Sequence, residues 1–527
     1  MSLSRVNASA ATLSKNRTED SITTLSGMCA TCIDGCVGMC EIGKSAYRGH
    51  EVLYPQPFGL ISTASQKVYP IDYSHFSIMG TTVGAVGIEP DSDKANFSAV
   101  DLETRLGRDQ GIRLKLPLVI CGMGSTRIAS VNWDGLAVGA ALSGVIATIG
   151  ENVCAMDPNA VIKQKRIVKS PELERRVRLF QNWQLDNYGD IVVQANIEDT
   201  SLGVQEYAIQ DLGVRVVEMK WGQGAKDIGG EVKINNLDWA LELKKRGYVV
   251  LPDPENPLVA EEFKKGAFKE FERHSRIGMV NMEDFVRRAE ELRKAGAQYI
   301  FLKTGAYRPA DLARAIKYCS MAGVDALTVD AAGGGTGMSP WRMMNEWGVP
   351  PVELHSLAHQ FCHTLAQKGQ YVPDIIFSGG FAMEDQMFKG LALGAPYVKC
   401  IGMARAPLTA AMVGKTLGRN IEENTLPVYV ERFGNSREKV FVTAAELKNL
   451  LGLERFEEVP AGALGVFTYC ERLSQGLKQI MCGSRKFAGR HIAREDIAAL
   501  TSQASQVSGI TVITETDQEE VRKILES

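Results

Sequence analysis

Short runs of apolar and β-branched residues recur through the middle of the chain, separated by stretches with helical spacing of apolar positions. Runs without apolar–polar alternation are typical of strands that are buried on both faces of a parallel sheet. Eight such strands are predicted, at residues 117–122, 144–148, 190–195, 214–220, 299–303, 326–330, 374–378 and 397–402. We therefore predict an α/β fold, a (β/α)8 TIM barrel over residues 113–415, with a doubly wound open sheet as the alternative.

The segments around the predicted barrel have different patterns. Residues 1–27 are rich in Ser, Thr, Asn and Ala and are predicted to be a mobile leader. A cysteine-rich segment follows at 28–44, then a connecting subdomain at 45–112 with a possible strand near Ser77. Residues 221–298 are too long for one crossover helix, so we expect an inserted loop or subdomain over the barrel mouth. Residues 416–527 are predicted to be a helical extension, with a helix-like stretch at 463–481 and one or two short amphipathic helices after 495.

Four cysteines near the start of the chain, Cys29, Cys32, Cys36 and Cys40, have the spacing CxxCxxxCxxxC. Such short spacings allow one loop to place its thiolates around a single inorganic centre, as in iron–sulfur proteins. A four-thiolate zinc site and a disulfide framework are the alternatives. We predict an iron–sulfur cluster of the 4Fe–4S kind, at which electrons enter. The remaining single cysteines are predicted to be mostly inert and buried.

Charge excludes little beyond nucleic acid and anionic membranes as partners. The formal net charge is −3, from 59 basic and 62 acidic residues, and no dense basic run occurs. No signal sequence is recognisable, and the apolar stretch at 135–150 is too short to cross a bilayer. Because thiolates and unpaired cysteines persist in a reducing compartment, we expect a cytoplasmic location.

Glycines follow the seventh and eighth predicted strands. The seventh runs into Ser378-Gly379-Gly380, and the eighth ends in Cys400-Ile401-Gly402. In a (β/α)8 barrel these two loops commonly bind phosphate, because glycine allows backbone N–H groups to approach the oxygens and a helix N-terminus adds positive potential. An ordinary tight turn is the alternative for either loop alone.

Polar residues end several other predicted strands. Lys303 closes the fifth strand, where its charge would stabilise electron density on a flavin ring; a lysine that reaches solvent at the rim is the alternative. Asp330 ends the sixth strand and enters a glycine-rich loop at 331–340. Other candidates are Glu151 after the second strand, Gln194 near the end of the third, and Lys226 in a second glycine-rich loop after the fourth.

Two glycine motifs carry a family resemblance. Gly222-Gln-Gly-Ala-Lys226 with Gly229-Gly230 is similar to GQGAKPGxGG, and Gly334-Gly-Thr-Gly337 is similar to GGTGA. Residues 148–151 and 378–380 match further segments in the same order. In these motifs residues 115–415 resemble the FMN-binding domain of glutamate synthases, particularly their short archaeal-type forms.

The resemblance implies a barrel that holds FMN and reduces an imine made from a 2-oxo acid and ammonia, 2-oxoglutarate giving glutamate. Electrons would come from ferredoxin or a partner subunit, and a separate amidotransferase is a candidate ammonia source. A homo-oligomer is expected. The implied catalytic residues are Lys226, Lys303 and Glu151. The implied FMN-binding residues are Met123, Gly124, Ser125, Gln194, Lys303, Asp330, Gly334, Gly335, Ser378, Gly379, Gly380, Ile401 and Gly402.

The chain departs from the family in two places. The family's CxxxxxCxxxxC motif for a 3Fe–4S cluster reads Cys400, Ala406 and Ala411 here, so that cluster is not expected and Cys29–Cys40 would replace it. The family's substrate-side segments become residues 200–204 and 276–281, with loss of an arginine. A different oxo acid, amine or amino acid is therefore an alternative substrate, and a non-catalytic electron-transfer subunit is an alternative function.

Three histidines, His355, His359 and His363, recur at every fourth position of one predicted helix. Histidines at this spacing can share a metal ion. A helix with a mixed core and surface face is the alternative, and the sequence leaves the choice open.

Overall fold

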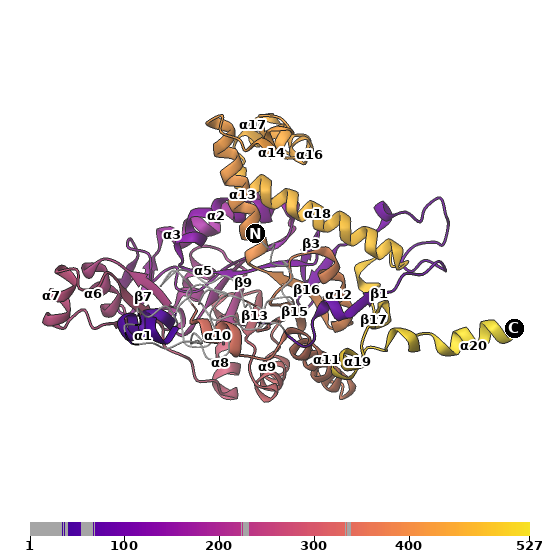
Figure 1. Cartoon of the computed structure of the whole chain (residues 1–527), viewed down its shortest axis with the longest axis horizontal. Helices are drawn as coiled ribbons and strands as arrows, with labels where there is room; N and C mark the ends of the chain where they lie inside the picture. Colours follow the sequence, from indigo (N-terminus) through magenta and orange to yellow (C-terminus); the bar gives the residue numbers. More distant parts are fainter. Residues whose placement is uncertain are drawn as a thin grey trace.

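The centre of the molecule is a closed barrel of parallel strands (Figure 1). The computed structural model describes residues 34, 36, 41–53, 67, 69–222, 224, 231–332, 334 and 339–527. Around the barrel the order is β13-β14-β15-β16-β4-β5-β8-β9. These are β4 (Leu118–Met123), β5 (Ile146–Ile149), β8 (Ile191–Ala195), β9 (Val216–Lys220), β13 (Tyr299–Thr304), β14 (Ala326–Asp330), β15 (Asp374–Ser378) and β16 (Val398–Met403). The predicted (β/α)8 barrel is confirmed, and the open sheet is excluded.

Helices cover the outside of the barrel between successive strands. They are α2 (Arg127–Ser143), α3 (Pro171–Trp183), α4 (Ile197–Leu202), α5 (Val204–Gln210), α8 (Met282–Ala295), α9 (Pro309–Ala322), α10 (Trp341–Glu346), α11 (Pro351–Gln367), α12 (Glu384–Gly394) and α13 (Arg405–Glu422). Gly144, which was predicted to start a strand, instead ends α2 in the left-handed conformation with φ +64°, so β5 begins only at Ile146.

The interior of the barrel changes from apolar to polar along each strand. A lower layer of inward side chains includes Val119, Val192, Phe301 and Cys400. The hairpin of β2 (Thr104–Leu106) and β3 (Ile112–Leu114) closes this end, because its leucines and isoleucine join the same buried cluster. Successive inward positions are two residues apart, and those next toward the carboxyl ends include Gln194, Glu218, Lys303, Thr328 and Ser378. The fold therefore gathers buried polar groups at the mouth of the barrel.

An inserted subdomain lies between β9 and β13, as predicted. It contains an antiparallel sheet in the order β10-β12-β11, made of β10 (Glu231–Ile234), β11 (Val249–Leu251) and β12 (Phe271–His274). The helices α6 (Leu237–Lys245) and α7 (Pro257–Lys264) accompany it and lie at one end of the molecule in Figure 1. A smaller hairpin, β6 (Val161–Lys163) with β7 (Arg166–Lys169), follows β5, and α1 (Glu41–Arg48) precedes the barrel.

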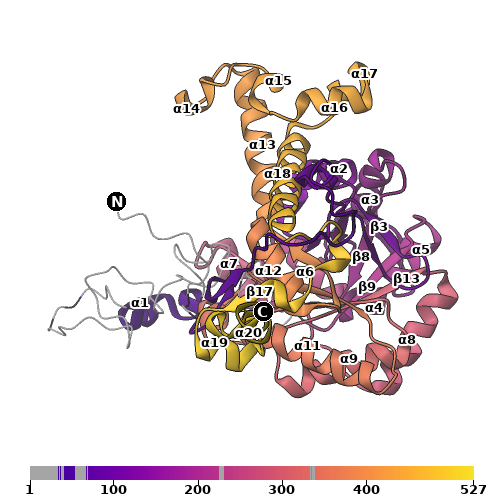
Figure 2. The ribbon, with the colours of Figure 1, turned by 90° about the vertical axis from the view of Figure 1, so that its right-hand side faces the viewer.

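The C-terminal extension forms a projecting arm. In Figures 1 and 2, α13 and α18 (Ala461–Gly483) leave the barrel side by side and carry four short helices at their tip. These are α14 (Val428–Glu431), α15 (Arg437–Val440), α16 (Ala444–Leu451) and α17 (Leu453–Glu457). Small residues allow α18 to approach α2 closely, because a Cβ on Gly139 would lie 2.5 Å from the Cβ of Val466. The helix expected at 463–481 is confirmed as α18.

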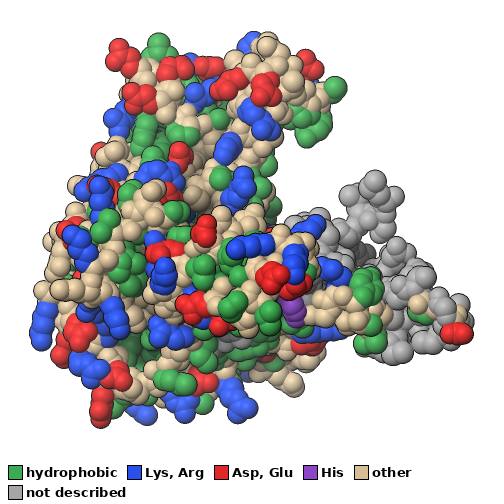
Figure 3. All heavy atoms as spheres, turned by 90° about the vertical axis from the view of Figure 1, so that its left-hand side faces the viewer, with side chains coloured by type: hydrophobic (Ala, Val, Ile, Leu, Met, Phe, Trp, Pro, Cys, Tyr) green, Lys and Arg blue, Asp and Glu red, His purple; other side chains and the backbone are tan. Residues whose placement is uncertain are grey.

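One strand of the extension was not predicted. β17 (Ile497–Ala499) pairs antiparallel with β1 (Phe76–Ile78), which is the strand expected near Ser77. The short helices α19 (Ser502–Ser508) and α20 (Gln518–Glu526) follow it. On the face shown in Figure 3, basic and acidic side chains are interspersed. Within the described ranges, none of the helices combines the length and apolar character needed to span a membrane.

Candidate functional site

A buried ion pair marks the mouth of the barrel. The Lys303 Nζ on β13 lies 3.1 Å from the Asp330 Oδ2 at the end of β14, and each side chain is less than a tenth exposed. Burial by itself lowers the pKa of Lys303, but Asp330 together with Cys121 and Glu218 outweighs burial and holds that pKa above its usual range. Burial likewise raises the pKa of Asp330, and Lys303 reverses the shift to a net lowering. Both groups are therefore charged at neutral pH.

Asp330 also joins three further parts of the site. It accepts hydrogen bonds from the Ser378 Oγ at 2.8 Å and from the backbone N–H of Gly224 at 3.0 Å. A Cβ on Gly224 would lie 1.9 Å from the carbonyl oxygen of Ala331, and one on Gly334 would lie 2.7 Å from the Asp330 Oδ1. The two glycine-rich loops thus meet at Asp330, and only glycine allows this approach. Lys226 and Gly335, which were predicted in these loops, lie outside the described residues.

A second carboxylate, Glu218, lies inside the barrel and was not predicted. It accepts hydrogen bonds from the Gln194 Nε2 at 2.5 Å and the Thr328 Oγ1 at 3.1 Å. Burial raises the pKa of Glu218, and the nearby Lys303 opposes the shift. The Oε1 of Gln194 is buried and has no hydrogen-bond partner within the described part of the chain. An unsatisfied buried acceptor of this kind fits a ligand that donates a hydrogen bond.

Two features at the ends of β15 and β16 fit a phosphate group. Gly379 and Gly380 follow β15 with φ of +104° and +103°, and a Cβ on Gly380 would meet nothing within 4 Å. Helix α13 begins at Arg405 directly after β16, and no side chain caps its N-terminus. Free backbone N–H groups and the helix dipole at such an end favour an anion. Of the predicted residues here, Ile401 points its side chain into the core outside the barrel, so only its backbone can face the mouth.

The ends of β4 and β5 are held against each other. A Cβ on Gly124 would lie 2.2 Å from the carbonyl oxygen of Glu151, so the two loops touch through backbone. Met123, Gly124 and Ser125 are half-buried at this edge. The Glu151 Oε1 lies 2.6 Å from the Nζ of Lys220 at the end of β9. Burial raises the pKa of Glu151, but Lys220 overcomes burial and lowers the pKa overall.

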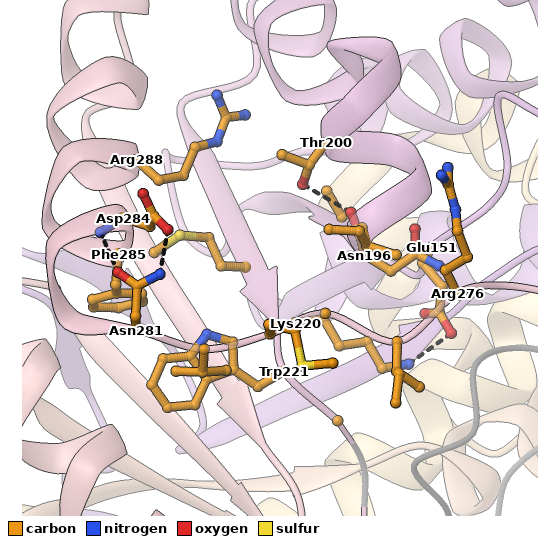
Figure 4. Close-up of a pocket in the computed structure, with 18 residues that line it drawn as sticks. Glu151, Asn196, Thr200, Lys220, Trp221, Arg276, Asn281, Asp284, Phe285 and Arg288 are labelled. Atoms are coloured by element: carbon orange, nitrogen blue, oxygen red, sulfur yellow. Dashed lines mark hydrogen bonds and ion pairs between the residues drawn. The ribbon is translucent and has the colours of Figure 1, made fainter.

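A cavity of about 220 Å³ opens beside this Lys220–Glu151 pair (Figure 4). The ends of β5, β8 and β9 form one wall, and residues 276–288 of the inserted segment and α8 form the other. The second wall includes residues 276–281, which the family resemblance had placed on the substrate side. Lys220 was not singled out from the sequence, although polar Glu218 and Lys220 alternate with apolar residues in β9. That alternation in an otherwise buried strand was the available signal.

Of the four predicted iron–sulfur ligands, the structure describes one, Cys36. Cys29, Cys32 and Cys40 lie outside the described residues, and Cys36 is exposed. The positions aligned with the family's other cluster do not converge: Cys400 belongs to the lower layer of the barrel, whereas Ala411 packs between α2 and α18. In the described ranges no group of three or more His, Cys, Asp or Glu residues is placed to hold a metal ion.

The histidine row divides between core and surface. His355 is fully buried, stacks on Phe377 at 3.9 Å, and contacts the Tyr73 hydroxyl through Nδ1 and the Val329 carbonyl through Nε2. His359 and His363 stack on each other further along α11, and the latter is exposed. The mixed core and surface helix is therefore the arrangement found.

Comparison with known proteins agrees with the motifs. Residues 273–414 match the family model described as the conserved region in glutamate synthase, which confirms the resemblance over that part of the chain. No curated protein sequence matches significantly. Among solved structures, the recombinant flavin-binding domain of baker's yeast flavocytochrome b2 is 12% identical, with 85% of this chain and 81% of that chain covered and a TM-score of 0.46. A mandelate oxidase variant with 2-hydroxy-phenylacetamide is 13% identical, with 80% and 85% covered and a TM-score of 0.43.

Proposed function

We propose that this chain is an FMN-dependent oxidoreductase that interconverts a 2-oxo acid plus ammonia and the corresponding amino acid. The match of residues 273–414 to the conserved region in glutamate synthase supports this proposal. The observation that carries the proposal is the buried Lys303–Asp330 pair beside an unsatisfied oxygen of Gln194. Burying a charged pair and an unpartnered hydrogen-bond acceptor in one site costs free energy, and the packing of the core does not require these groups. They are well suited to a polar, planar ligand.

The residues at the mouth fit FMN at both of its ends. A flavin pyrimidine ring offers an N–H donor for Gln194 and carbonyl oxygens for the Lys303 ammonium. The phosphate would lie at Gly379, Gly380 and the N-terminus of α13, because the space at Gly380 is open and no side chain caps the helix. Met123, Gly124 and Ser125, with Gly334 and Gly402, would border the ring.

FMN, when bound, supplies hydride transfer, and the chain supplies orientation and electrostatics. Lys303 stays protonated because Asp330 holds it, so it can stabilise negative charge that develops nearby. Glu151 and Lys220 present opposite charges at the cavity, where a substrate carboxylate and amine would lie. By the family resemblance, Lys226 would also face the substrate.

Electron supply is a further part of the proposal. We propose that Cys29, Cys32, Cys36 and Cys40 bind a 4Fe–4S cluster that passes electrons from ferredoxin or a donor subunit. Iron and acid-labile sulfide in the purified chain, lost together in Cys32→Ser, would support this. Zinc without sulfide would rule it out. A cytoplasmic homo-oligomer with a separate amidotransferase is the setting that this proposal expects.

Flavin content tests the central proposal. The full chain, expressed with riboflavin and purified, should retain FMN, and Lys303→Met should lose it or slow its reduction by at least roughly 100-fold, because the charge at the ring is removed. Lys368→Met, at an exposed position after α11, is the matched control and should behave as the native chain. A native chain that binds no FMN would overturn the proposal and leave the non-catalytic alternative.

Two substrates are candidates. 2-Oxoglutarate, giving glutamate, follows from the family resemblance. A different 2-oxo acid or amino acid is favoured by one observation, the engagement of both cavity arginines by glutamates of this chain.

A further inference from the structure

The cavity beside the Lys220–Glu151 pair is small and holds balanced charges. Its volume of about 220 Å³ suits one molecule the size of an amino acid. At its base the Lys220 ammonium and the Glu151 carboxylate are 2.6 Å apart (Figure 4). Such a pair complements the carboxylate and amino group that every α-amino acid carries. The rest of the lining therefore decides which side chain fits.

The arginines of the lining are already paired. Arg276 binds Glu198 through its Nη2 at 2.6 Å, its Nε at 3.1 Å and its backbone N–H at 2.9 Å. Glu198 is only 4% exposed, so taking Arg276 away would leave a buried carboxylate without its counter-ion.

Arg288 is engaged in the same way. It donates to Glu206 at 2.5 Å and to Gln205 at 3.0 Å, and its Nε is buried and has no hydrogen-bond partner among the described residues. In Figure 4 the guanidinium groups of Arg276 and Arg288 point away from Trp221 and the Lys220–Glu151 pair. Each arginine of the described lining thus has its own glutamate outside the Lys220–Glu151 pair, so among the described lining residues only Lys220 lies beside the proposed substrate position.

Apolar side chains make up much of the remaining lining. Met219 and Trp221 belong to the wall formed by strand ends and Phe285 to the opposite wall, and the ring of Trp221 meets that of Phe285 edge-on at 5.2 Å. Ile277, Met279 and Val280 also belong to the opposite wall and are 52%, 87% and 46% exposed. Exposed apolar groups that line a cavity gain free energy when an apolar ligand covers them.

We propose that this cavity selects a 2-oxo acid or amino acid with a single carboxylate and an apolar side chain, and discriminates against the dicarboxylate 2-oxoglutarate. The selection rests on the proposed function, because it assigns the substrate class of that same site. The carboxylate would bind at Lys220, the amino or oxo group beside Glu151, and the side chain among Trp221, Met279 and Phe285.

Calorimetric titration of the purified holoprotein tests the selection. 4-Methyl-2-oxopentanoate should bind at least about 10-fold more tightly than 2-oxoglutarate, because the second carboxylate of the dicarboxylate must be desolvated and meets no unpaired arginine in the described lining. Equal or tighter binding of 2-oxoglutarate, or binding of neither acid, would overturn the proposal. FMN content is measured on the same samples, so a chain that keeps FMN but prefers 2-oxoglutarate refutes the selection without refuting the proposed function.

Two variants should shift the preference toward 2-oxoglutarate. Met279→Arg adds an unpaired cation at a side chain that is 87% exposed, and should tighten 2-oxoglutarate binding by about 10-fold. Glu198→Gln should act similarly, because it releases Arg276. Met321→Arg, on α9 at a side chain that is 48% exposed, is the matched control and should change neither affinity. If both cavity variants fold and neither differs from the control, the assignment of the cavity is wrong.

Discussion

The ammonium of Lys303 and the carboxylate of Asp330 lie 3.1 Å apart on neighbouring strands, where neither side chain is more than a tenth exposed. Such a pair is costly to disrupt from one side, since the remaining charge is left buried without a counter-ion. Asp330 also accepts hydrogen bonds from the hydroxyl of Ser378 and from the backbone N–H of Gly224. One carboxylate therefore positions the lysine, a strand end and a glycine-rich loop together.

Replacing Asp330 with Asn should lower the free energy of unfolding by about 3 kcal/mol or more, because Lys303 loses its counter-ion. Urea unfolding measures the loss. The control Asp311→Asn removes an exposed pair with Arg314 and should cost less than about 1 kcal/mol. Adding Lys303→Met to Asp330→Asn should recover part of the loss. If Asp330→Asn costs no more than Asp311→Asn, the buried pair does not stabilise the fold.

Gly380→Ala should weaken FMN binding, since a methyl group would occupy the open space where the phosphate is proposed. Gly266→Ala is the matched control: it also has positive φ, at +77°, and also meets nothing within 4 Å. Both changes should cost about 1 kcal/mol or more of stability through backbone strain. Only Gly380→Ala should raise the Kd for FMN, by about 10-fold or more. Equal Kd values for the two variants would place the phosphate elsewhere.

Asp199 should make stability fall as pH rises. Burial raises its pKa to about 7, against the hydrogen bond from the Asn152 backbone. Between about pH 4 and 7 the folded chain keeps a proton that the unfolded chain has lost, so the free energy of unfolding declines across this window, by as much as roughly 4 kcal/mol. Denaturant unfolding at a series of pH values measures the decline.

The substitution Asp199→Asn should flatten this pH dependence, because the amide does not titrate. Asp93→Asn, at an exposed loop position, should leave it as in the native chain. A native profile that rises between pH 4 and 7 and is unchanged in Asp199→Asn would mean that this carboxyl is ionised in the folded state.

Tyr73→Phe should destabilise the fold by about 1–3 kcal/mol, because the buried Nδ1 of His355 loses the hydroxyl that lies 2.5 Å away. Thermal unfolding measures the shift. Tyr429→Phe is the control, on a side chain that is 71% exposed, and should stay within about 0.5 kcal/mol. If both variants unfold alike, the contact between Tyr73 and His355 contributes nothing.

Much of the barrel and part of its mouth were predictable from local pattern. All eight strands were expected because continuous apolar runs require burial on both faces. Lys303 and Asp330 were each expected at the carboxyl end of a barrel strand, where the active site of such a fold lies, but their pairing was not predicted. Glu218 and Lys220 were missed, since they looked like ordinary interruptions of an apolar strand. Their importance depends on Gln194, Thr328 and Glu151, which other strands contribute.

The sequence by itself determined the barrel, its glycine loops and the placement of Lys303, Asp330 and Glu151 at strand ends, because hydrophobic periodicity and glycine placement act over a few residues. Tertiary structure alone decided that Asp330 joins both glycine loops, that β17 pairs with β1, and that the cavity arginines are already engaged. Each of these depends on contacts between residues far apart in the chain. Such contacts decide which charged side chains of the cavity are already paired, and the local sequence pattern does not reveal this pairing.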